Sequence, residues 1–295
     1  MFRIAHLTDP HVGPLPRAKV RELFSKRFAG WFNWHRNRRT AHDMELLAAL
    51  VADIKAQAPD HIACTGDLCN IGLPSEWAPS RIFMEGLGPP EAVSFVPGNH
   101  DAYVEGSLEG LLAQLAPWTR GDDGTMCRFP YVRRRGKVAL VGLSSAIPTM
   151  PLVASGKCGP KQLREGERVL RELAGEKLFR IVMIHHPPHV GGAPAGRNLI
   201  DARGFETMIG GAGAELVIHG HNHVGSLAWL MGPDAKVPVI GAPSASARGG
   251  TIVHSAGYYL YTVGGDGAGF TLKAELRGLK KDGTVGDLGV IELHA

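Results

Sequence analysis

The stretch Ala92-Val93-Ser94-Phe95-Val96-Pro97-Gly98-Asn99-His100-Asp101 joins a short apolar run to a polar loop that contains a glycine. The run Ala92–Val96 has the length and the β-branched content of a buried strand. The polar residues Asn99, His100 and Asp101 follow at its carboxyl end, where α/β folds gather their functional side chains. The stretch therefore predicts an α/β protein with a functional loop at the end of a strand.

The same arrangement of an apolar run and a polar cluster recurs four more times along the chain. The pairs are Arg3–Leu7 with Asp9-Pro10-His11, His61–Thr65 with Gly66-Asp67, Phe179–Ile184 with His185-His186-Pro187-Pro188, and Glu215–Ile218 with Gly220-His221-Asn222-His223. Because the carboxyl ends of parallel strands meet at one edge of a sheet, the five clusters are expected to lie close together.

Helical patterns lie between several of these runs. The clearest is the face of Met44, Leu47, Ala48, Val51 and Ile54, for which Thr40–Asp43 is the predicted capping box. Two further helices are predicted at Pro79–Leu87 and Pro160–Leu173, each with its proline as the first helical residue. Beyond His223 only strand-like runs separated by glycine turns remain. An α/β part followed by an all-β part predicts two stacked sheets flanked by helices.

The bulk properties are those of an ordinary globular enzyme. The 295 residues are 44% hydrophobic and 20% charged, which excludes a disordered or fibrous chain and predicts a single domain over residues 1–295. The net charge of +4 suits an anionic substrate but is too small for a dedicated nucleic-acid binder. Four cysteines without a CxxC pair, and an N-terminus that runs directly into a strand pattern, predict a cytoplasmic location.

The residue types of the five clusters indicate metal chemistry. Carboxylate and imidazole groups suit divalent Mn, Fe and Zn, and a carboxylate can bridge two ions. Two ions about 3.5–4 Å apart can activate a water molecule and hold both the attacking and the leaving oxygen of a phosphoryl group. Taken singly, Asp9-Pro10-His11 can be a turn, Asn99 a turn residue, and His186 a buried core histidine. Their joint presence in this order favours a site for two metal ions.

The ordered series D-x-H, G-D, G-N-H-D, H-H-P-P and G-H-x-H, which runs from Asp9 to His223, resembles the calcineurin-like metallophosphoesterases. This resemblance implies the family's four-layer αββα sandwich with two mixed β-sheets. It also implies that His100 protonates the leaving oxygen and that Asp101 orients His100. The implied ligands are Asp9, His11, Asp67 and His223 for one ion, and Asp67, Asn99, His185 and His221 for the other.

An insert at about residues 13–39 departs from this pattern. It is rich in cations and aromatic residues: Arg17, Lys19, Arg21, Lys26, Arg27, Arg36, Arg38 and Arg39, with Phe24, Phe28, Trp31, Phe32 and Trp34. On a helix, Val20, Leu23, Phe24, Phe28, Trp31 and Phe32 share one face. Three interpretations stay open: a helix that packs this stripe on the domain, a cap that grips the substrate, and a foot that contacts an anionic membrane surface.

The loop motifs most resemble the class III cyclic-nucleotide phosphodiesterase branch. This implies hydrolysis of a phosphodiester by a metal-bridging hydroxide, with two ions of Mn, Fe or Zn and a small nucleotide or lipid-linked phosphate ester as the partner. A phosphomonoesterase remains open, as does a pyrophosphohydrolase that acts on a lipid-linked or nucleotide diphosphate. A DNA nuclease, or a scaffold without catalytic activity, is less expected, since every ligand position is filled. The natural substrate and the oligomeric state stay open.

Overall fold

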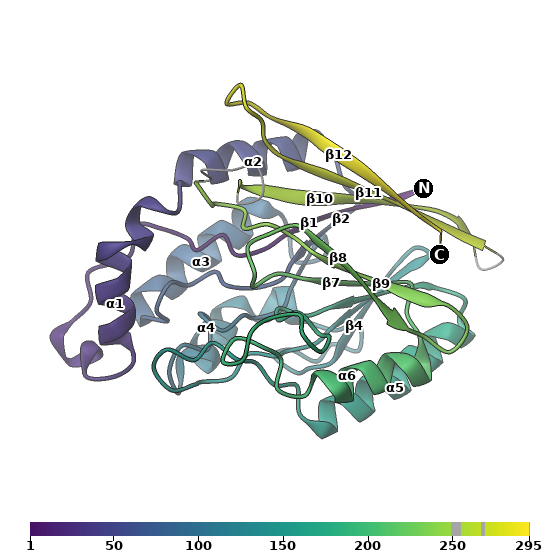
Figure 1. Cartoon of the computed structure of the whole chain (residues 1–295), viewed down its shortest axis with the longest axis horizontal. Helices are drawn as coiled ribbons and strands as arrows, with labels where there is room; N and C mark the ends of the chain where they lie inside the picture. The colour runs from purple at the N-terminus through teal and green to yellow at the C-terminus, as the bar shows by residue number, and fades with distance from the viewer. Residues whose placement is uncertain (249–254, 267–268, 295) are drawn as a thin grey trace.

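The computed structural model describes residues 1–248, 255–266 and 269–294. Two six-stranded sheets lie face to face, with helices on the outer face of each (Figure 1). The four-layer αββα architecture expected from the sequence is confirmed. Within the described ranges, no helix is both long enough and apolar enough to cross a membrane.

Each sheet combines parallel and antiparallel pairs. The order of the first sheet is β12 (Val285–His294), β11 (Gly269–Leu279), β10 (Gly257–Asp266), β1 (Phe2–Leu7), β2 (His61–Cys64) and β3 (Val93–Phe95). The order of the second is β4 (Tyr131–Arg135), β5 (Val138–Gly142), β6 (Phe179–Met183), β7 (Leu216–His219), β9 (Lys236–Gly241) and β8 (Ser226–Met231). Strands β1, β2 and β3 are parallel, as are β5, β6, β7 and β9, so the two parallel blocks lie inside mixed sheets.

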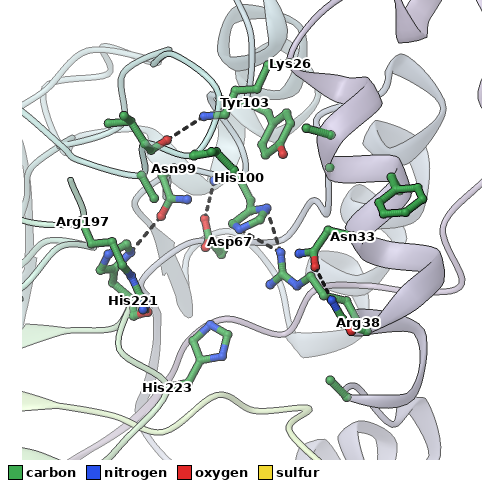
Figure 2. A pocket seen from close by; sticks show the side chains of 18 of the residues that line it. Lys26, Asn33, Arg38, Asp67, Asn99, His100, Tyr103, Arg197, His221 and His223 are labelled. Carbon is green, nitrogen blue, oxygen red and sulfur yellow. Dashed lines mark hydrogen bonds between the residues drawn. The ribbon is translucent and has the colours of Figure 1, made fainter. Parts of the chain in front are cut away.

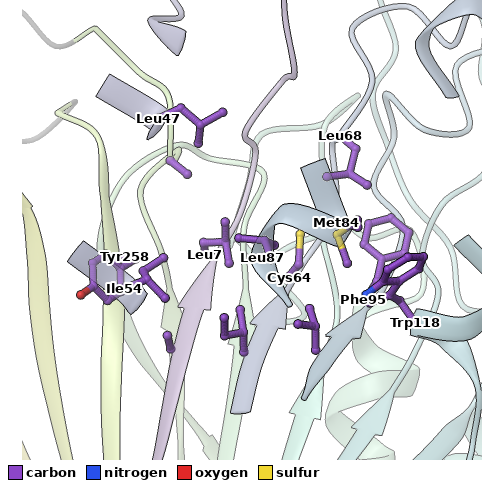
Figure 3. Close-up of a cluster of buried hydrophobic side chains, with 14 of the residues drawn as sticks. Leu7, Leu47, Ile54, Cys64, Leu68, Met84, Leu87, Phe95, Trp118 and Tyr258 are labelled. Atoms are coloured by element: carbon purple, nitrogen blue, oxygen red, sulfur yellow. The ribbon is translucent and has the colours of Figure 1, made fainter. Parts of the chain in front are cut away.

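The helices form the two outer layers. Helices α2 (Met44–Ala56), α3 (Pro74–Leu87) and α4 (Ser107–Leu115) pack on the first sheet, whereas α5 (Pro160–Gly175) and α6 (Ala202–Ala212) pack on the second. Figure 3 shows the core beneath the first group, where Leu7, Met84 and Phe95 meet. Three short 3-10 helices, η1 (Val20–Leu23), η2 (Arg38–Thr40) and η3 (Ala116–Thr119), and helix α1 (Arg27–Arg36) complete the fold.

Period-two alternation along the strands explains the layers. On β6, Ile181 and Met183 face the other sheet, whereas Val182 packs under α5 and α6. All three are fully buried, and each such side chain contributes about 1.5–3 kcal/mol relative to an exposed one. A strand buried on both faces reads as a continuous apolar run, which is why the sequence located these strands.

Two helix starts differ from the predictions. Helix α2 is capped by Asp43, whose carboxylate accepts from the N–H groups of Glu45 and Leu46, whereas Thr40 lies in η2. Helix α3 begins at Pro74, so Pro79 lies inside it. The buried carboxylate of Glu76 fixes this earlier start, because it accepts the N–H of Leu73 at 2.8 Å. Helix α5 begins at Pro160, as predicted.

The insert is not one helix with a buried aromatic stripe. Helix α1 is seated through Gly30, which is buried where Tyr103 and Ile71 approach too closely for a Cβ. This seating turns Phe28 and Phe32 outward, so that both are more than half exposed, and Phe24, which precedes α1, is 85% exposed. Trp31 alone of the aromatic stripe packs on the cluster that contains Ile71 and Tyr103. The interpretation that the stripe packs on the domain is therefore wrong for the three phenylalanines.

Candidate metal centre

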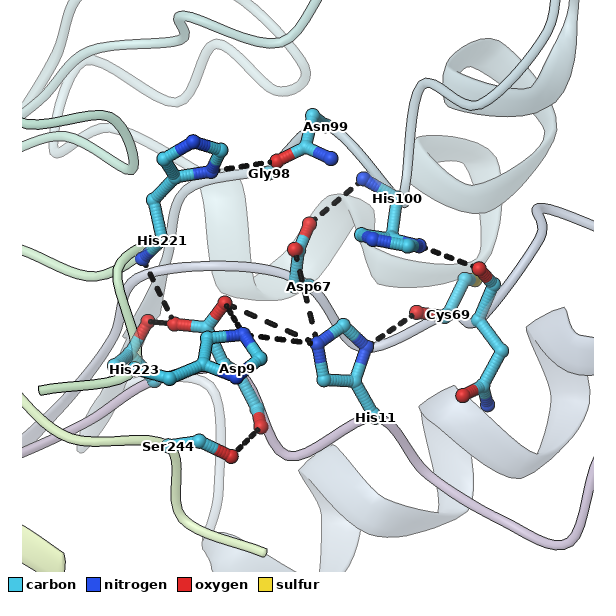
Figure 4. Close-up of polar contacts among 12 residues, drawn as sticks. Asp9, His11, Asp67, Cys69, Gly98, Asn99, His100, His221, His223 and Ser244 are labelled. Atoms are coloured by element: carbon cyan, nitrogen blue, oxygen red, sulfur yellow. Dashed lines mark hydrogen bonds and ion pairs between the residues drawn. The ribbon is translucent and has the colours of Figure 1, made fainter. Parts of the chain in front are cut away.

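The five polar loops meet at one end of the two parallel strand blocks, as the sequence predicted. They follow the carboxyl ends of β1, β2 and β3 in the first sheet, and of β6 and β7 in the second. Figure 4 shows residues of the loops after β1, β2, β3 and β7 turned toward one another. We call the seven expected ligands that meet here the metal centre: Asp9, His11, Asp67, Asn99, His185, His221 and His223. All of them are buried except His223, which is partly exposed.

Asp9, His11 and His223 form the first cluster. Nε2 of His223 lies 3.1 Å from Oδ1 of Asp9 and 3.4 Å from Nε2 of His11. The distance from Nε2 of His11 to the same Asp9 oxygen is 3.9 Å. Ligand atoms bound about 2.1 Å from a tetrahedral metal ion stand roughly 3.4 Å apart. The spacing of the three side chains is thus that of ligands around one ion.

Asp67, Asn99, His185 and His221 form the second cluster. Nε2 of His185 lies 3.2 Å from Oδ1 of Asn99 and 3.4 Å from Oδ2 of Asp67. Nδ1 of His221 lies 2.9 Å from the same Asn99 oxygen. Oδ2 of Asp67 is also 3.9 Å from Nε2 of His11, so this carboxylate lies between the two clusters. Its position agrees with the bridging role that the family resemblance implies.

The buried carboxylates of the metal centre require positive charge beside them. Burial opposes ionisation of Asp9, yet His223 and His185 hold the pKa of Asp9 well below its usual value. Burial also opposes ionisation of Asp67, whose pKa is lowered by His185 and His100. For His185, burial disfavours the charged form, but Asp67 and Asp9 outweigh it and raise the pKa of His185 to about 10. Two buried carboxylates are stable only beside positive charge.

Oδ1 of Asp9, an atom of the first cluster, is buried and accepts no hydrogen bond within the described residues, although Nε2 of His223 lies 3.1 Å away. Buried polar atoms are nearly always satisfied, so an unpaired carboxylate oxygen beside imidazole nitrogens indicates a ligand position. The donor set of carboxylate, imidazole and amide oxygen fits divalent ions of the Mn, Fe and Zn type. The residues of the metal centre therefore fit two divalent metal ions.

Backbone groups hold the ligands in place. Nδ1 of His11 pairs with the carbonyl of Cys69 at 3.1 Å, and Nδ1 of His185 with the carbonyl of Thr65 at 2.6 Å, which directs both Nε2 atoms into the centre. Five ligands have the left-handed backbone that non-glycine residues rarely adopt: Asp9, His11, Asp67, His221 and His223. Such strain persists only where the surrounding fold over-determines it, and it clusters at functional sites.

Gly98 shows how tightly the loops pack. A Cβ at this position would collide with Oδ1 of Asp67 and Cε1 of His185. The sequence placed Gly98 in a polar loop, and the close approach of Asp67 and His185 is the physical reason for a glycine there.

Asp101 is placed differently from the sequence-based expectation. Its Oδ2 accepts from the N–H groups of Asp67 and Gly98, each at 2.9 Å, and its Oδ1 accepts from Cys69 at 3.0 Å. Among the hydrogen bonds of the described residues, none joins Asp101 to the ring of His100. Asp101 therefore braces two ligand loops, and the carbonyl of Asn70, 2.5 Å from Nδ1, orients the His100 ring. Burial, followed by the charge of Asp67, raises the pKa of Asp101 to about 7.

A cavity of about 820 Å³ opens above the metal centre (Figure 2). Its floor includes Asp67, Asn99 and His100. The insert supplies one wall, and the segment 152–154 another. Lys26 connects these two walls, because its Nζ donates to Oγ1 of Thr149 at 2.7 Å and to the carbonyl of Val153 at 2.8 Å. The sequence could not show this connection, since its partners lie more than 120 positions away.

Arg38 is a further candidate functional residue, which the sequence did not distinguish from the other cations of the insert. Its Nη2 donates to Nε2 of His11 at 3.0 Å, and its Nη1 donates to Nε2 of His100 at 2.9 Å. Burial, followed by Arg38, holds the pKa of His11 well below its usual value and lowers the pKa of His100 to about 3. His42 also joins the site, with its ring centroid 4.6 Å from that of His11. No motif marked either residue.

His186 has the structural role that a lone histidine usually has. It is fully buried, its Nδ1 lies 2.7 Å from Oγ of Ser145, and its Nε2 lies 3.1 Å from the carbonyl of Ala154. Both ring nitrogens are therefore satisfied by the fold, and neither reaches the metal centre.

Comparisons with known proteins agree with this geometry. A family model described as calcineurin-like phosphoesterase matches residues 2–225. A dimetal phosphatase from Danio rerio has a similar structure, with a TM-score of 0.67 and 13% identity over 99% of this chain and 98% of that chain. Purple acid phosphatase PPD1 from yellow lupin (Lupinus luteus) seeds gives a TM-score of 0.59 and 14% identity, covering 99% of this chain and 53% of that chain. At such identities these structures show the fold alone. A search of curated proteins found no significant match. Because the family model spans about three quarters of the sequence, the chain belongs to the calcineurin-like phosphoesterase family.

Proposed function

We propose that the protein is a dinuclear metal-dependent phosphodiesterase in which the insert 13–39 forms a cap over the substrate. Membership of the family supports hydrolysis of phosphoesters in general. The observation that carries the diester proposal is the cavity of about 820 Å³, which extends past the metal centre toward Lys26 and Val153 and toward Asn33 and Asn37. A cavity of this size has room for a substituent on each side of a phosphate.

Two bound metal ions would supply Lewis-acid polarisation of the phosphoryl oxygens and a water molecule of lowered pKa. The protein's own residues position and neutralise the substrate. Arg38 and Arg197 line the cavity and bring positive charge to an anionic phosphate, and Lys26 adds a third cation. The ligand loops are preorganised by buried backbone hydrogen bonds, so little reorganisation is needed during reaction.

His100 is our candidate for the group that protonates the leaving oxygen. Asn70 fixes Nδ1 of the ring, which leaves Nε2 to face the cavity. In the arrangement described here, Arg38 donates to Nε2, so that atom has no proton to give. The acid role therefore requires Arg38 to move off the ring when the substrate binds. A general acid of this kind contributes about 10²–10⁴-fold in rate for a poor leaving group.

Leaving groups of different basicity test this role. His100→Ala should retain the metal ions, lose much of its activity on alkyl or ribose diesters, and lose far less on p-nitrophenyl esters, whose leaving group needs no proton. Metal content by elemental analysis and turnover on both substrate types are the measurements. Loss of metal, or equal slowing on both substrates, would show that His100 is a ligand or a phosphate-binding residue.

The cap proposal rests on how the insert is attached. Arg27 anchors α1 to the domain by donating from Nε to the carbonyl of Ile71 at 3.2 Å and from Nη2 to that of Gly72 at 2.5 Å. Lys26 ties the same end of the helix to the segment 149–153 across the cavity. An element held at both walls of a site is positioned to contact the substrate directly.

A second candidate is supported by the apolar side chains around the cavity. Phe28 and Phe32 on the insert and Leu152 on the facing segment, which is 96% exposed, line the cavity and form an apolar rim. Exposed apolar groups gathered at a site mark a ligand or a membrane surface. The rim favours a lipid-linked diphosphate substrate, with peripheral contact of the insert with the inner face of the membrane. We therefore also propose the cytoplasmic location that the sequence predicts.

Hydrolysis by the protein loaded with Mn²⁺ tests the two candidates. Bis(p-nitrophenyl) phosphate should be a better substrate than p-nitrophenyl phosphate, with Asp67→Ala as the control for contaminating activity. A preference for the monoester would contradict the diester proposal. A parallel screen of cyclic nucleotides, nucleotide diphosphate sugars and phospholipid diesters then separates the substrate classes. Binding to vesicles with and without anionic lipid, compared between the native protein and Phe24→Ser, tests the membrane contact.

A further inference from the structure

The guanidinium of Arg38 occupies an unusual position for a half-buried cation. It reaches from η2 into the floor of the cavity, where its Nη1 lies 2.9 Å from Nε2 and 3.2 Å from Nδ1 of His100 (Figure 2). Its Nη2 donates to Nε2 of His11 at 3.0 Å. Within the described ranges, no ion pair joins Arg38 to a carboxylate. Buried arginines are normally paired with carboxylate or phosphate oxygens, because the planar fork of N–H donors matches such groups. Arg38 therefore has a position suited to an anion that the chain itself does not supply.

The contact with His11 conflicts with metal binding. An arginine can only donate, so Nε2 of His11 must be the acceptor, and its Nδ1 is already paired with the carbonyl of Cys69. Nε2 has a single lone pair, and that lone pair points toward the other ligand atoms of the first cluster, 3.4 Å from Nε2 of His223. A guanidinium and a metal ion cannot both use it, and two adjacent cations repel each other.

We propose that Arg38 and a metal ion compete for the Nε2 lone pair of His11, so that metal binding releases the guanidinium to bind the phosphate of the substrate. The part concerning phosphate rests on the proposed phosphoesterase function, whereas the competition with metal does not. Arg38 thereby acts as a positioning residue for the substrate, and it makes a full phosphate-binding site conditional on a filled metal site.

The neighbouring residues show why Arg38 is suited to this role and its neighbours are not. Arg36 and Arg39 are exposed, whereas Arg38 is brought inward by the short helix η2. Because η2 lies between α1 and α2, movement of Arg38 is coupled to the end of the insert. Trp34 lines a smaller cavity of about 230 Å³ together with Arg38 and His11, so its indole lies where such a movement would be sensed.

Calorimetric titrations with Mn²⁺ and with inorganic phosphate test the proposal without measuring turnover. Arg38→Met keeps the length of the side chain and removes its charge, and Arg36→Met is the matched control. Arg38→Met should bind the first Mn²⁺ about tenfold more tightly than the native protein, as expected when one charge-assisted contact no longer competes. The metal-loaded variant should bind phosphate about tenfold more weakly. Arg36→Met should change neither affinity.

The opposite signs of the two effects exclude a purely structural role. If Arg38 only supports the site, Arg38→Met would weaken both Mn²⁺ and phosphate, and the proposal would be wrong. Unchanged Mn²⁺ affinity would equally overturn the competition. As a second measurement, Trp34 fluorescence in the native protein should change on addition of Mn²⁺ and should change less in Arg38→Met, with Trp34→Phe identifying the signal. Failure to hydrolyse any diester, with both affinity changes present, would contradict the proposed function and leave the competition intact.

Discussion

The floor and the wall of the cavity are built by opposite means. The metal centre at the floor is buried, and its side chains are held by backbone carbonyl and N–H groups from five strand ends. The insert at the wall is largely exposed and is attached through a few contacts, chiefly those of Lys26, Arg27 and Gly30. The floor is therefore expected to tolerate almost no change, and the insert to tolerate many.

The difference assigns separate tasks to the two regions. Chemistry at a phosphoryl group requires ligands placed to within fractions of an ångström, which only a rigid core provides. Selection of the substrate's remaining parts requires variable surface, which a weakly attached insert provides. Substitutions at the floor, and at Arg38, which reaches the floor from the insert, should thus change metal binding and turnover, whereas substitutions in the rest of the insert should change the Michaelis constant and the range of substrates.

The largest effect is expected at Asp67, the carboxylate between the two clusters. Asp67→Ala should reduce turnover by about 10³-fold or more and lower the content of both metal ions, because the loss of one preorganised electrostatic group already costs about that much. Asp9→Ala should chiefly disturb the first ion. Metal-to-protein ratios and kcat on a diester are the measurements. Equal metal loss in the two variants would show that Asp67 does not bridge.

The same glycine-to-alanine substitution can be made in the floor, at Gly98, and in the insert, at Gly30. Gly98→Ala places a Cβ against Asp67 and His185 and should lower the free energy of unfolding by about 1–3 kcal/mol, the usual cost of overpacking, with loss of metal. Gly30→Ala places a Cβ against the ring of Tyr103 and a methyl group of Ile71, so α1 must shift, and the helix preference of alanine, about 1 kcal/mol, offsets only part of the cost. We expect Gly30→Ala to retain the metal, to lose part of its stability as α1 moves off the domain, and to raise the Michaelis constant.

Denaturant unfolding and metal analysis of the two glycine variants measure the expected differences in stability and metal content. If Gly30→Ala also lost its metal ions, the insert would be part of the metal centre, and the division of tasks proposed here would fail.

The smallest effect is expected at Lys26, which connects the insert to the segment 149–153. Lys26→Met should raise the Michaelis constant of bulky diesters several-fold and leave kcat on a small chromogenic diester within about twofold, since a partly exposed polar contact contributes about 0.5–1.5 kcal/mol. The exposed Lys19 provides the control, as Lys19→Met should have no effect. A fall in kcat on the small diester would mean that Lys26 acts in catalysis rather than in holding the cap.

The sequence predicted the floor far better than the insert. Asp9, His185 and His223 follow strands buried on both faces, and such strands are marked by continuous apolar runs that local reading detects. The orientation of α1 stayed open, because its aromatic periodicity was compatible both with packing on the domain and with an exposed cap or membrane foot. A single glycine at position 30, whose importance depends on Tyr103 more than 70 positions away, decides which side packs.

The role of Asp101 was missed for a related reason. The family resemblance implied that Asp101 orients the ring of His100. In a tight turn, however, an aspartate readily accepts hydrogen bonds from nearby backbone N–H groups, and here it bonds to Gly98 three residues earlier. Contacts of that kind depend on backbone conformation, which residue order alone does not define.

The position of β1 has a consequence for how the chain folds. This first strand lies between β2 and the late strand β10, with Phe2 paired to Val263, and Asp9 meets His223 in the first cluster. The central strand of the first sheet therefore lacks one partner until nearly the whole chain has been synthesised. Pairings of such sequence separation form slowly, because a long loop must close before any contact is gained. Metal binding is consequently expected late in folding, and it indicates that both sheets have formed.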